Sequence, residues 1–287
     1  MITAAVLCPS PPLLAREVTG RDPVVPELRQ ACAEAVRRLV RCEPDVIAVV
    51  GPAPVTVRWP VDRRLDLSGF APQAVPADVP EVAGTPHAAG APEVAGTPHA
   101  AGVPEVADAP HAADARDAAG APGPDQPRPL SGHPPLPLSL GLGTRLLDQA
   151  GYAGSRALEA VGYDEPTAGC AAIGEQIAAS GGRVGLLIMA DGSARRGPRA
   201  PGYLDERAAA FDAAVENAVR NGDLDALLDI DPALARQLLA AGRPAWQVLA
   251  GAVHGQPSAA EILYSGDPFG VAYLVAWMPC LGRMPGT

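Results

Sequence analysis

The sequence predicts an α/β protein in which helices flank a mainly parallel central sheet, built by a single domain that a long insertion interrupts. Two observations predict the fold class. The chain contains short, continuous apolar runs, and these alternate with segments of helical periodicity, as buried parallel strands alternate with their crossover helices. A third observation predicts the interruption, because a proline-rich repeat separates two such blocks. We therefore expect residues 1–70 and 138–287 to form the two parts of one α/β domain, with residues 71–137 as the insertion.

The first block contains two predicted strands and a helix between them. The run ITAAVLC at 2–8 is typical of a buried strand and ends at Pro9. The second strand is DVIAVVG at 45–51, which is short, β-branched and closed by Gly51-Pro52. A helix is expected over 26–42, where apolar residues recur with helical spacing at Leu28, Ala31, Ala35, Leu39 and Val40.

The second block continues the alternation of helices and strands. Its clearest strand is RVGLLIMA at 183–190. Gly222 is expected to end one helix, and Asp231 and Pro232 are expected to begin the next as its N-cap and first residue. Helices are predicted over 138–151, 166–180, 203–221, 231–241 and 246–254, and closing strands near 259–264 and 270–277.

The insertion is a repeat with a period of 12 residues. VPEVAGTPHAAG at 79–90 is followed by two close copies, and residues 71–137 hold 15 of the 33 prolines. Such a segment buries too little apolar surface to offset the entropy lost on ordering, so we expect it to be disordered. A metal-binding array formed by His87, His99, His111, Glu81, Glu93 and Glu105 is the alternative. Duplication of one unit fully explains the regular spacing, which favours disorder over a metal-binding array.

Composition excludes several classes of protein. The formal net charge is -10 and all 22 basic residues are arginine, which argues against a nucleic-acid partner because phosphate binding needs clustered cations. No run of about 18 apolar residues is present, so we expect no membrane partner. The five cysteines are scattered without a C-x-x-C pair, which is typical of reduced thiols and predicts a cytoplasmic protein.

Residues that carry chemistry are expected in the loops after the predicted strands, because ligands of such sheets bind outside the carboxyl ends of the strands. The loop that begins at Asp191 is the most polar of these. Its two arginines present planar donor forks that suit a carboxylate or phosphate. The alternative is a turn at Asp191-Gly192 followed by a solvated face and a helix start. The candidate ligand-binding residues are Ser10, Asp191, Gly192, Ser193, Arg195, Arg196, Tyr203 and Glu206.

Several segments together resemble a known family. The opening strand ending in SPPLL, the strand VIAVVGP, the segments LLIMADGSARRG and GYLDERAAAFDAAV, and PAWQVLAGAV are similar in order and character to the class III extradiol ring-cleavage dioxygenases of the protocatechuate 4,5-dioxygenase β-subunit type. Within that superfamily they are most similar to an actinobacterial branch. The resemblance covers both blocks and skips the insertion. It implies Fe(II) held by two histidines and one carboxylate, a further catalytic histidine, and frequent oligomerisation.

The positions that match the family's functional residues depart from its pattern. Ser10 stands at the first histidine ligand, Ala53 and Pro54 at the second, and Ser193 and Ala194 at the catalytic histidine, while Arg243 and Pro244 stand where the carboxylate is expected. Four of the five histidines, His87, His99, His111 and His133, lie in the insertion, and the fifth is His254 near a helix end. We therefore expect no metal and no iron cofactor.

Three functions follow from these observations. The first is a pseudoenzyme that keeps the dioxygenase-like scaffold and binds a small anionic or aromatic molecule, or a protein partner. The second is an active extradiol-type dioxygenase, or another enzyme that uses the loop from Asp191 to Arg196. The third is a subunit of a homo-oligomer. The residues alone leave open which of the three applies.

Overall fold

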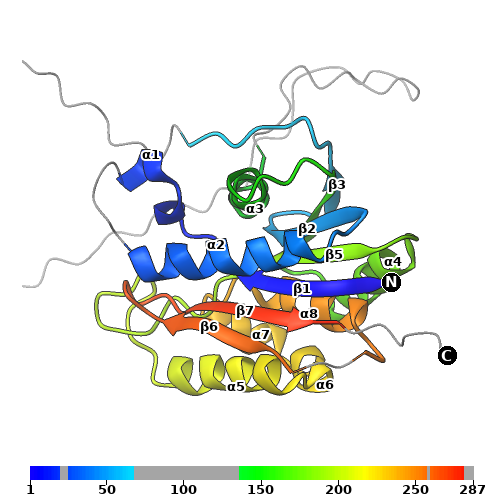
Figure 1. The fold of residues 1–287 in the computed structure, drawn as a ribbon. Helices are drawn as coiled ribbons and strands as arrows, with labels where there is room; N and C mark the ends of the chain where they lie inside the picture. Colours follow the sequence, from blue (N-terminus) through cyan, green and yellow to red (C-terminus); the bar gives the residue numbers. More distant parts are fainter. Residues whose placement is uncertain (20–24, 68–135, 257–258, 281–287) are drawn as a thin grey trace, which may run out of the picture. The chain divides into compact units, whose positions relative to one another are not determined.

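Seven strands form one sheet in the computed structural model, in the order β3-β4-β2-β5-β1-β7-β6 (Figure 1). The structure describes residues 1–19, 25–67, 136–256 and 259–280. The strands are β1 (Ile2–Cys8), β2 (Val46–Ala53), β3 (Val57–Trp59), β4 (Ser155–Gly162), β5 (Val184–Met189), β6 (Glu261–Gly266) and β7 (Tyr273–Pro279). The helices are α1 (Arg16–Thr19), α2 (Pro26–Arg41), α3 (Leu138–Gln149), α4 (Thr167–Ala179), α5 (Arg207–Asn221), α6 (Leu224–Leu228), α7 (Pro232–Gln237) and α8 (Arg243–Ala252).

The sheet is mixed, and the expectation that it is mainly parallel is not confirmed. Its centre, β4-β2-β5-β1, is parallel throughout, and the outer pairs β3/β4, β1/β7 and β6/β7 are antiparallel. The reason is connectivity. The chain returns from α8 into β6 and β7, which form a hairpin and are therefore antiparallel to each other, and β7 also runs antiparallel to β1.

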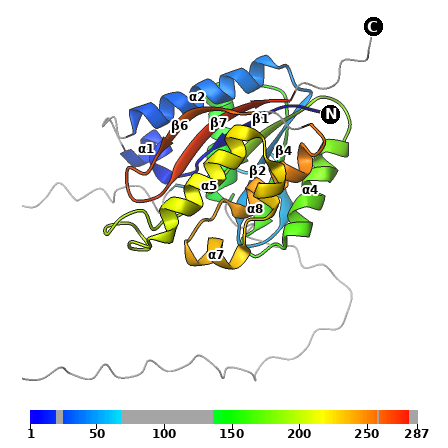
Figure 2. The ribbon, with the colours of Figure 1, turned by 90° about the horizontal axis from the view of Figure 1, so that it is seen from below.

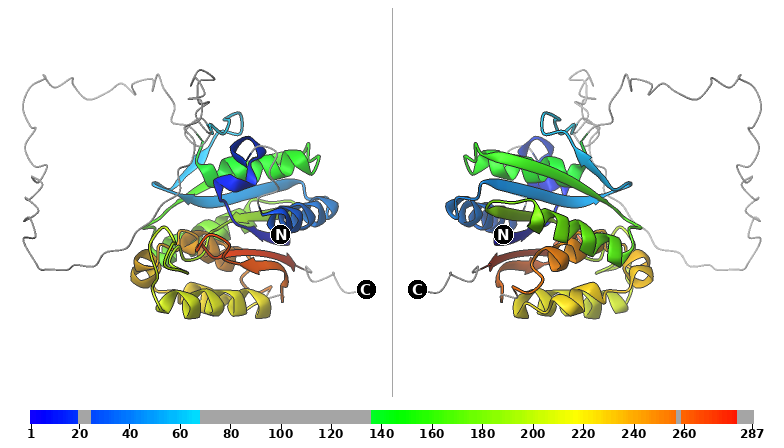
Figure 3. Two further views of the ribbon diagram at one scale, coloured as in Figure 1. Left: turned by 90° about the vertical axis from the view of Figure 1, so that its left-hand side faces the viewer. Right: turned by 90° about the vertical axis from the view of Figure 1, so that its right-hand side faces the viewer.

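Helices cover both faces of the sheet and create two apolar cores. Helices α2 and α3 pack on one face, and α4, α5 and α8 lie on the other, as Figures 2 and 3 show from below and from the sides. Alternate side chains of each central strand enter opposite cores, so Leu186 and Ile188 of β5 face α8 while Leu187 and Met189 join the core under α2 and α3. Burial on both faces explains why these strands are apolar along their whole length.

The structure contains all five helices predicted for the second block, with shifted ends. It also contains the strands predicted at 2–8, 45–51 and 183–190. Gly222 ends α5 with a positive φ of 67°, and the Asp231 side chain caps α7, as the sequence indicated. Helix α5 begins at Arg207 rather than Tyr203, because Tyr203 has a φ of 59°. Helix α7 ends at Gln237 and not at 241, because Leu239 also has a positive φ. Strands β3 and β4 were not predicted.

The predicted insertion falls almost entirely outside the described residues. Residues 71–135 of the predicted insertion, with His87, His99, His111 and His133, lie outside them. Leu136, which we assigned to the insertion, is instead buried in the core, and Pro137 directly precedes α3. Among the described helices, none is long and apolar enough to cross a membrane.

Candidate functional site

The loops that follow β1, β2 and β5 gather at one edge of the sheet. These three strands are parallel neighbours, with Cys8 beside Met189 at their ends, so their carboxyl ends open on the same side (Figure 1). This edge is where α/β proteins bind ligands. Two of the three loops, those after β1 and β5, supply the polar residues that the sequence singled out.

Ser10 and Asp191 meet at this edge. The backbone N–H of Ser10 donates to Oδ1 of Asp191 at 2.7 Å, and the Ser10 hydroxyl donates to Oδ2 at 3.1 Å. The backbone carbonyl of Asp191 accepts from the N–H of Gly242 at 2.8 Å, which adds the start of α8 to the group. Burial raises the pKa of the Asp191 carboxyl to about 6, against the opposing effect of the two hydrogen bonds from Ser10.

Ser193 repeats this arrangement with a different carboxylate. It is fully buried, and its backbone N–H and hydroxyl donate to Oδ1 and Oδ2 of Asp212 on α5 at 2.9 and 2.5 Å. Burial raises the pKa of Asp212, and the hydrogen bonds from Ser193 and the charge of Arg196 lower it in part. The hydroxyl of Ser193 is therefore held by an acid inside the fold and is not presented as a nucleophile.

The two adjacent arginines turn in different directions. Nε of Arg196 lies 2.9 Å from Asp267 and 3.8 Å from Asp212, so its charge is already compensated. Nε of Arg195 is buried and has no hydrogen-bond partner among the described residues. The carbonyl of Arg195 accepts from the N–H of Asp205 at 3.1 Å, which folds the loop back on itself.

Gly192 and Arg196 line a cavity of about 250 Å³ between α5 and the β6–β7 hairpin. Asp212, Glu216 and Asp267 also line it, so three carboxylates face one guanidinium. An anion in this cavity would be repelled at short range, where charges interact most strongly. The surroundings of Arg196 therefore do not favour the anionic ligand that the sequence suggested for it.

Tyr203 and Glu206 are exposed residues in the segment that leads into α5. The Tyr203 side chain is 75% exposed, and Glu206 is an exposed residue that precedes α5. Between them, Asp205 accepts from both the backbone N–H and the guanidinium of Arg207, the first residue of α5.

Arg243 is a residue of this region whose burial the sequence did not reveal. It is only 2% exposed and begins α8 beside Gly242. Its Nη1 donates to the Glu165 carbonyl at 2.7 Å and to Oε1 of Gln247 at 2.9 Å, and its Nη2 donates to the Tyr163 carbonyl at 2.6 Å. A helix that starts with Arg-Pro gives no sequence signal of burial, because arginine at a helix start is usually exposed.

These residues do not fit the iron centre that the family resemblance implies. Fe(II) of that type needs two imidazoles and a carboxylate with open positions between them. At the corresponding positions lie a serine that donates to Asp191, the apolar end of β2, and the Arg243 cation. No group of three or more His, Cys, Asp or Glu side chains that could hold a metal occurs among the described residues.

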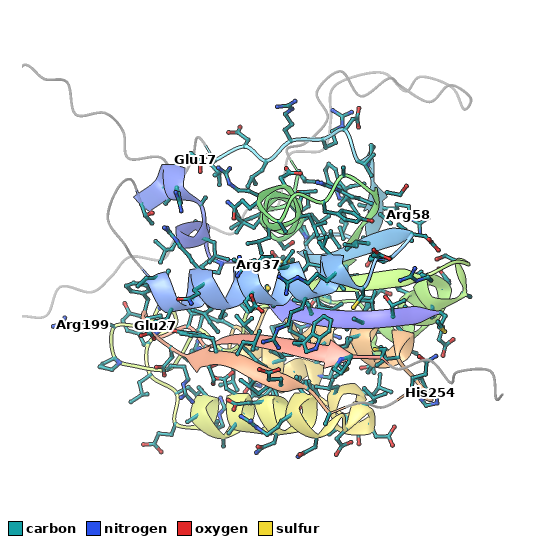
Figure 4. All side chains as sticks on the ribbon, viewed as in Figure 1. Glu17, Glu27, Arg37, Arg58, Arg199 and His254 are labelled. Carbon is teal, nitrogen blue, oxygen red and sulfur yellow. The ribbon has the colours of Figure 1, made fainter. Side chains whose placement is uncertain are left out.

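The single described histidine, His254, is exposed just beyond α8 (Figure 4). Helix α8 starts beside Asp191 and ends before His254, so the helix separates that imidazole from the Ser10–Asp191 pair. Cys8, at the end of β1, is fully buried, and burial raises the pKa of its thiol well above the usual range. Neither residue supplies a nucleophile or base to the edge.

Comparison with known proteins adds no family to this description. No protein-family model matches the chain, and no curated protein matches it. The fold and the site define an α/β protein with a mixed seven-stranded sheet and a polar cluster at the carboxyl edge of its parallel strands.

Proposed function

We propose that this chain is a class III extradiol dioxygenase-like protein that does not carry out iron-dependent ring cleavage and instead binds a small anionic or aromatic molecule at the carboxyl edge of its sheet. The observation that carries the proposal is the pairing of Ser10 with Asp191. The family resemblance implies an iron ligand at the position of Ser10, but the N–H and the hydroxyl of Ser10 both donate to the Asp191 carboxylate.

The electrostatics of the edge support the same proposal. The backbone N–H of Gly242 bonds to the Asp191 carbonyl, so Arg243 begins α8 at the side of the cluster. The guanidinium of Arg243 lies against the carbonyls of the loop after β4, and a buried cation at that point disfavours a divalent cation and favours an anion. The cytoplasmic location and the self-association expected from the sequence belong to this proposal as well.

The first experiment is anaerobic reconstitution of the full chain with Fe(II), followed by measurement of bound iron and of oxygen uptake with a panel of catechols. We expect iron well below one ion per chain and no oxygen uptake. Stoichiometric iron with catechol-dependent uptake would overturn the proposal. Asp191→Asn serves as the control, because iron that persists in this variant is bound elsewhere.

An enzyme that uses Asp191 is the second candidate, favoured by one observation. A carboxyl with a pKa near 6, hydrogen-bonded at the carboxyl edge of a sheet, has the properties of a general acid or base. Turnover of any substrate should then fall at least about a hundredfold in Asp191→Asn, as is typical for loss of such a group. The fold should persist, because an asparagine can accept from the Ser10 N–H.

A further inference from the structure

A cavity of about 300 Å³ lies at the carboxyl edge, between the loop after β4 and helix α7. Its floor includes Arg243, and its side includes Arg236 of α7 and Asp164 of the loop. The remaining lining is apolar or aromatic, namely Tyr163, Pro232, Ala235, Leu239, Ala240 and Ala241. Its size is at the lower end of the range for small-molecule sites, about 300–1,000 Å³.

The charge of Arg243 is uncompensated within the described structure. The groups that accept from it are the carbonyls of Tyr163 and Glu165 and the amide oxygen of Gln247, all of them neutral. Among the described residues, no carboxylate lies within ion-pair distance of its guanidinium. A buried cation held only by neutral acceptors carries a large desolvation penalty, and an anion placed nearby would offset part of it.

Arg236 supplies a second cation at the mouth of the cavity. It pairs with Asp164, but both side chains are mostly exposed, at 66% and 75%. Exposed ion pairs contribute little, about 0–1 kcal/mol, so this guanidinium can exchange its partner for a ligand. With two arginines and one aspartate, the lining is net positive in a chain whose overall charge is -10.

Leu239, one of the lining residues, is an exposed leucine just beyond the end of α7. Leu239 has a φ of 55° and is 46% exposed, and Tyr163, which also lines the cavity, is 49% exposed. The positive φ closes helix α7, because the N–H of Leu239 donates to the Arg236 carbonyl and the N–H of Ala240 donates to the Ala235 carbonyl, the bonding pattern of a helix that ends with a left-handed residue. Leu239 and Tyr163 therefore leave apolar surface exposed at the cavity.

From these observations we infer that the cavity binds a short aliphatic carboxylate, with its anionic group toward Arg243 and Arg236 and its hydrocarbon part against Leu239 and the alanines. The aliphatic character of the lining sets the ligand class, because Tyr163 is the only aromatic side chain among the residues that line this cavity. The inference rests on the proposed binding role, and it is independent of the loss of iron chemistry.

The test uses the full chain with hexanoate and its neutral isostere hexanamide, measured by isothermal titration calorimetry and by the shift in thermal midpoint. We expect saturable binding of hexanoate in the millimolar range or tighter and at least about tenfold weaker binding of hexanamide, since the ionic partner roughly doubles the strength of each hydrogen bond. Absence of saturable hexanoate binding, or equal binding of the two, would overturn the inference.

Two pairs of variants locate the site without disturbing the core. Arg236→Gln should weaken hexanoate binding about three- to tenfold. Arg199→Gln removes the same charge from an exposed residue, labelled in Figure 4, that does not line the cavity, and it should leave binding unchanged. Leu239→Asp should bind at least about tenfold more weakly than Leu239→Asn, because both residues tolerate positive φ and only the first repels an anion. Equal behaviour within either pair would place the ligand elsewhere and overturn the inference.

Arg243→Lys tests the floor of the cavity. It retains the positive charge and loses the planar fork, so hexanoate should bind more weakly even where the fold survives. Iron content and hexanoate binding are measured on the same preparation. Stoichiometric iron with intact hexanoate binding would refute the proposed function alone, and absence of both would refute the inference alone.

Discussion

Ser10 donates both its backbone N–H and its hydroxyl to the two carboxylate oxygens of Asp191, and this pair joins the ends of two adjacent parallel strands. Two residues after Asp191, Ser193 makes the same pair of bonds to the carboxylate of Asp212. The loop after β5 is therefore fixed by two serine–aspartate pairs on its two sides. One joins it to the loop after β1 and the other to α5.

The first prediction concerns the pH dependence of stability. The pKa of Asp191 is about 6 in the native state and about 3.9 in an unfolded chain. The native state therefore keeps this proton to higher pH, so Asp191 lowers the free energy of unfolding as pH rises from about 4 to about 6, by up to about 3 kcal/mol. Above about pH 7, where the carboxyl is ionised in both states, its contribution is constant. Urea unfolding at intervals from pH 4 to 7.5 measures this slope.

Asp191→Asn should flatten the decline and raise stability above pH 6, because the amide cannot ionise. Asp212→Asn is the matched control. Burial also raises the pKa of Asp212, so that variant should remove its own part of the decline and leave the part due to Asp191. If Asp191→Asn retained the wild-type slope between pH 4 and 6, the raised pKa would be refuted.

The second prediction compares two serines that donate to carboxylates. Ser193→Ala leaves Asp212 without its 2.5 Å bond inside the fold, so we expect a loss of about 1.5–3 kcal/mol in the free energy of unfolding. Ser265 donates to Glu216 at 2.6 Å on the surface, and Ser265→Ala should cost less than about 1 kcal/mol. Denaturant titrations of both variants decide the matter, and equal losses would contradict the distinction between buried and exposed bonds.

The sequence predicted the strands whose apolar pattern has a single cause, namely burial on both faces of the sheet. The strands β1, β2 and β5 are buried on both faces, so they are apolar throughout and stand out from their surroundings. Strand β4 was missed because SRALEAVG mixes charges with small residues. Its Glu159 is buried beside Arg58 of β3, and this pairing of two strands about a hundred residues apart leaves no local signal.

The candidate site divides in the same way. That Ser10 and Asp191 follow parallel strands can be read from the chain, and so can their common edge. Their hydrogen bonds, and the compensation of Arg196 by Asp267 in the turn before β7, depend on the approach of distant segments. The burial of Arg243 depends on the carbonyls of the loop after β4, a strand that the sequence did not predict.

The third prediction concerns the contact between α4 and α8. A Cβ on Gly174 would lie 2.5 Å from the backbone nitrogen of Ala252 and still closer to the carbonyl of Val248, so the two helices would have to separate. We expect Gly174→Ala to lower the free energy of unfolding by about 2–4 kcal/mol, despite the better helix propensity of alanine.

Gly169 in the same helix provides the control for this variant. A Cβ there meets only the flexible side chain of Glu165, so Gly169→Ala should be neutral or stabilising by up to about 1 kcal/mol. Thermal unfolding of both proteins gives the comparison. A neutral effect of Gly174→Ala would show that α4 and α8 do not approach so closely.

The last prediction concerns the reactivity of the five cysteines. Cys42, after α2, is the one that is partly exposed, while the other four are buried. Burial raises the pKa of Cys42 as well as the pKa values of Cys8, Cys170 and Cys280, which reach about 11 for Cys170 and about 12 for Cys280, so Cys42 is distinguished by its access to solvent. With Ellman's reagent at pH 8, one thiol of the native protein should therefore react quickly, and all five thiols should react in denaturant.

The variants identify the thiol that reacts quickly. Cys42→Ser should abolish the fast phase, whereas Cys32→Ser should retain it. A fast phase that survives in Cys42→Ser would mean that a strand-end or helix thiol is accessible, and the packing of α2 and α4 against the sheet would be looser than the structure describes.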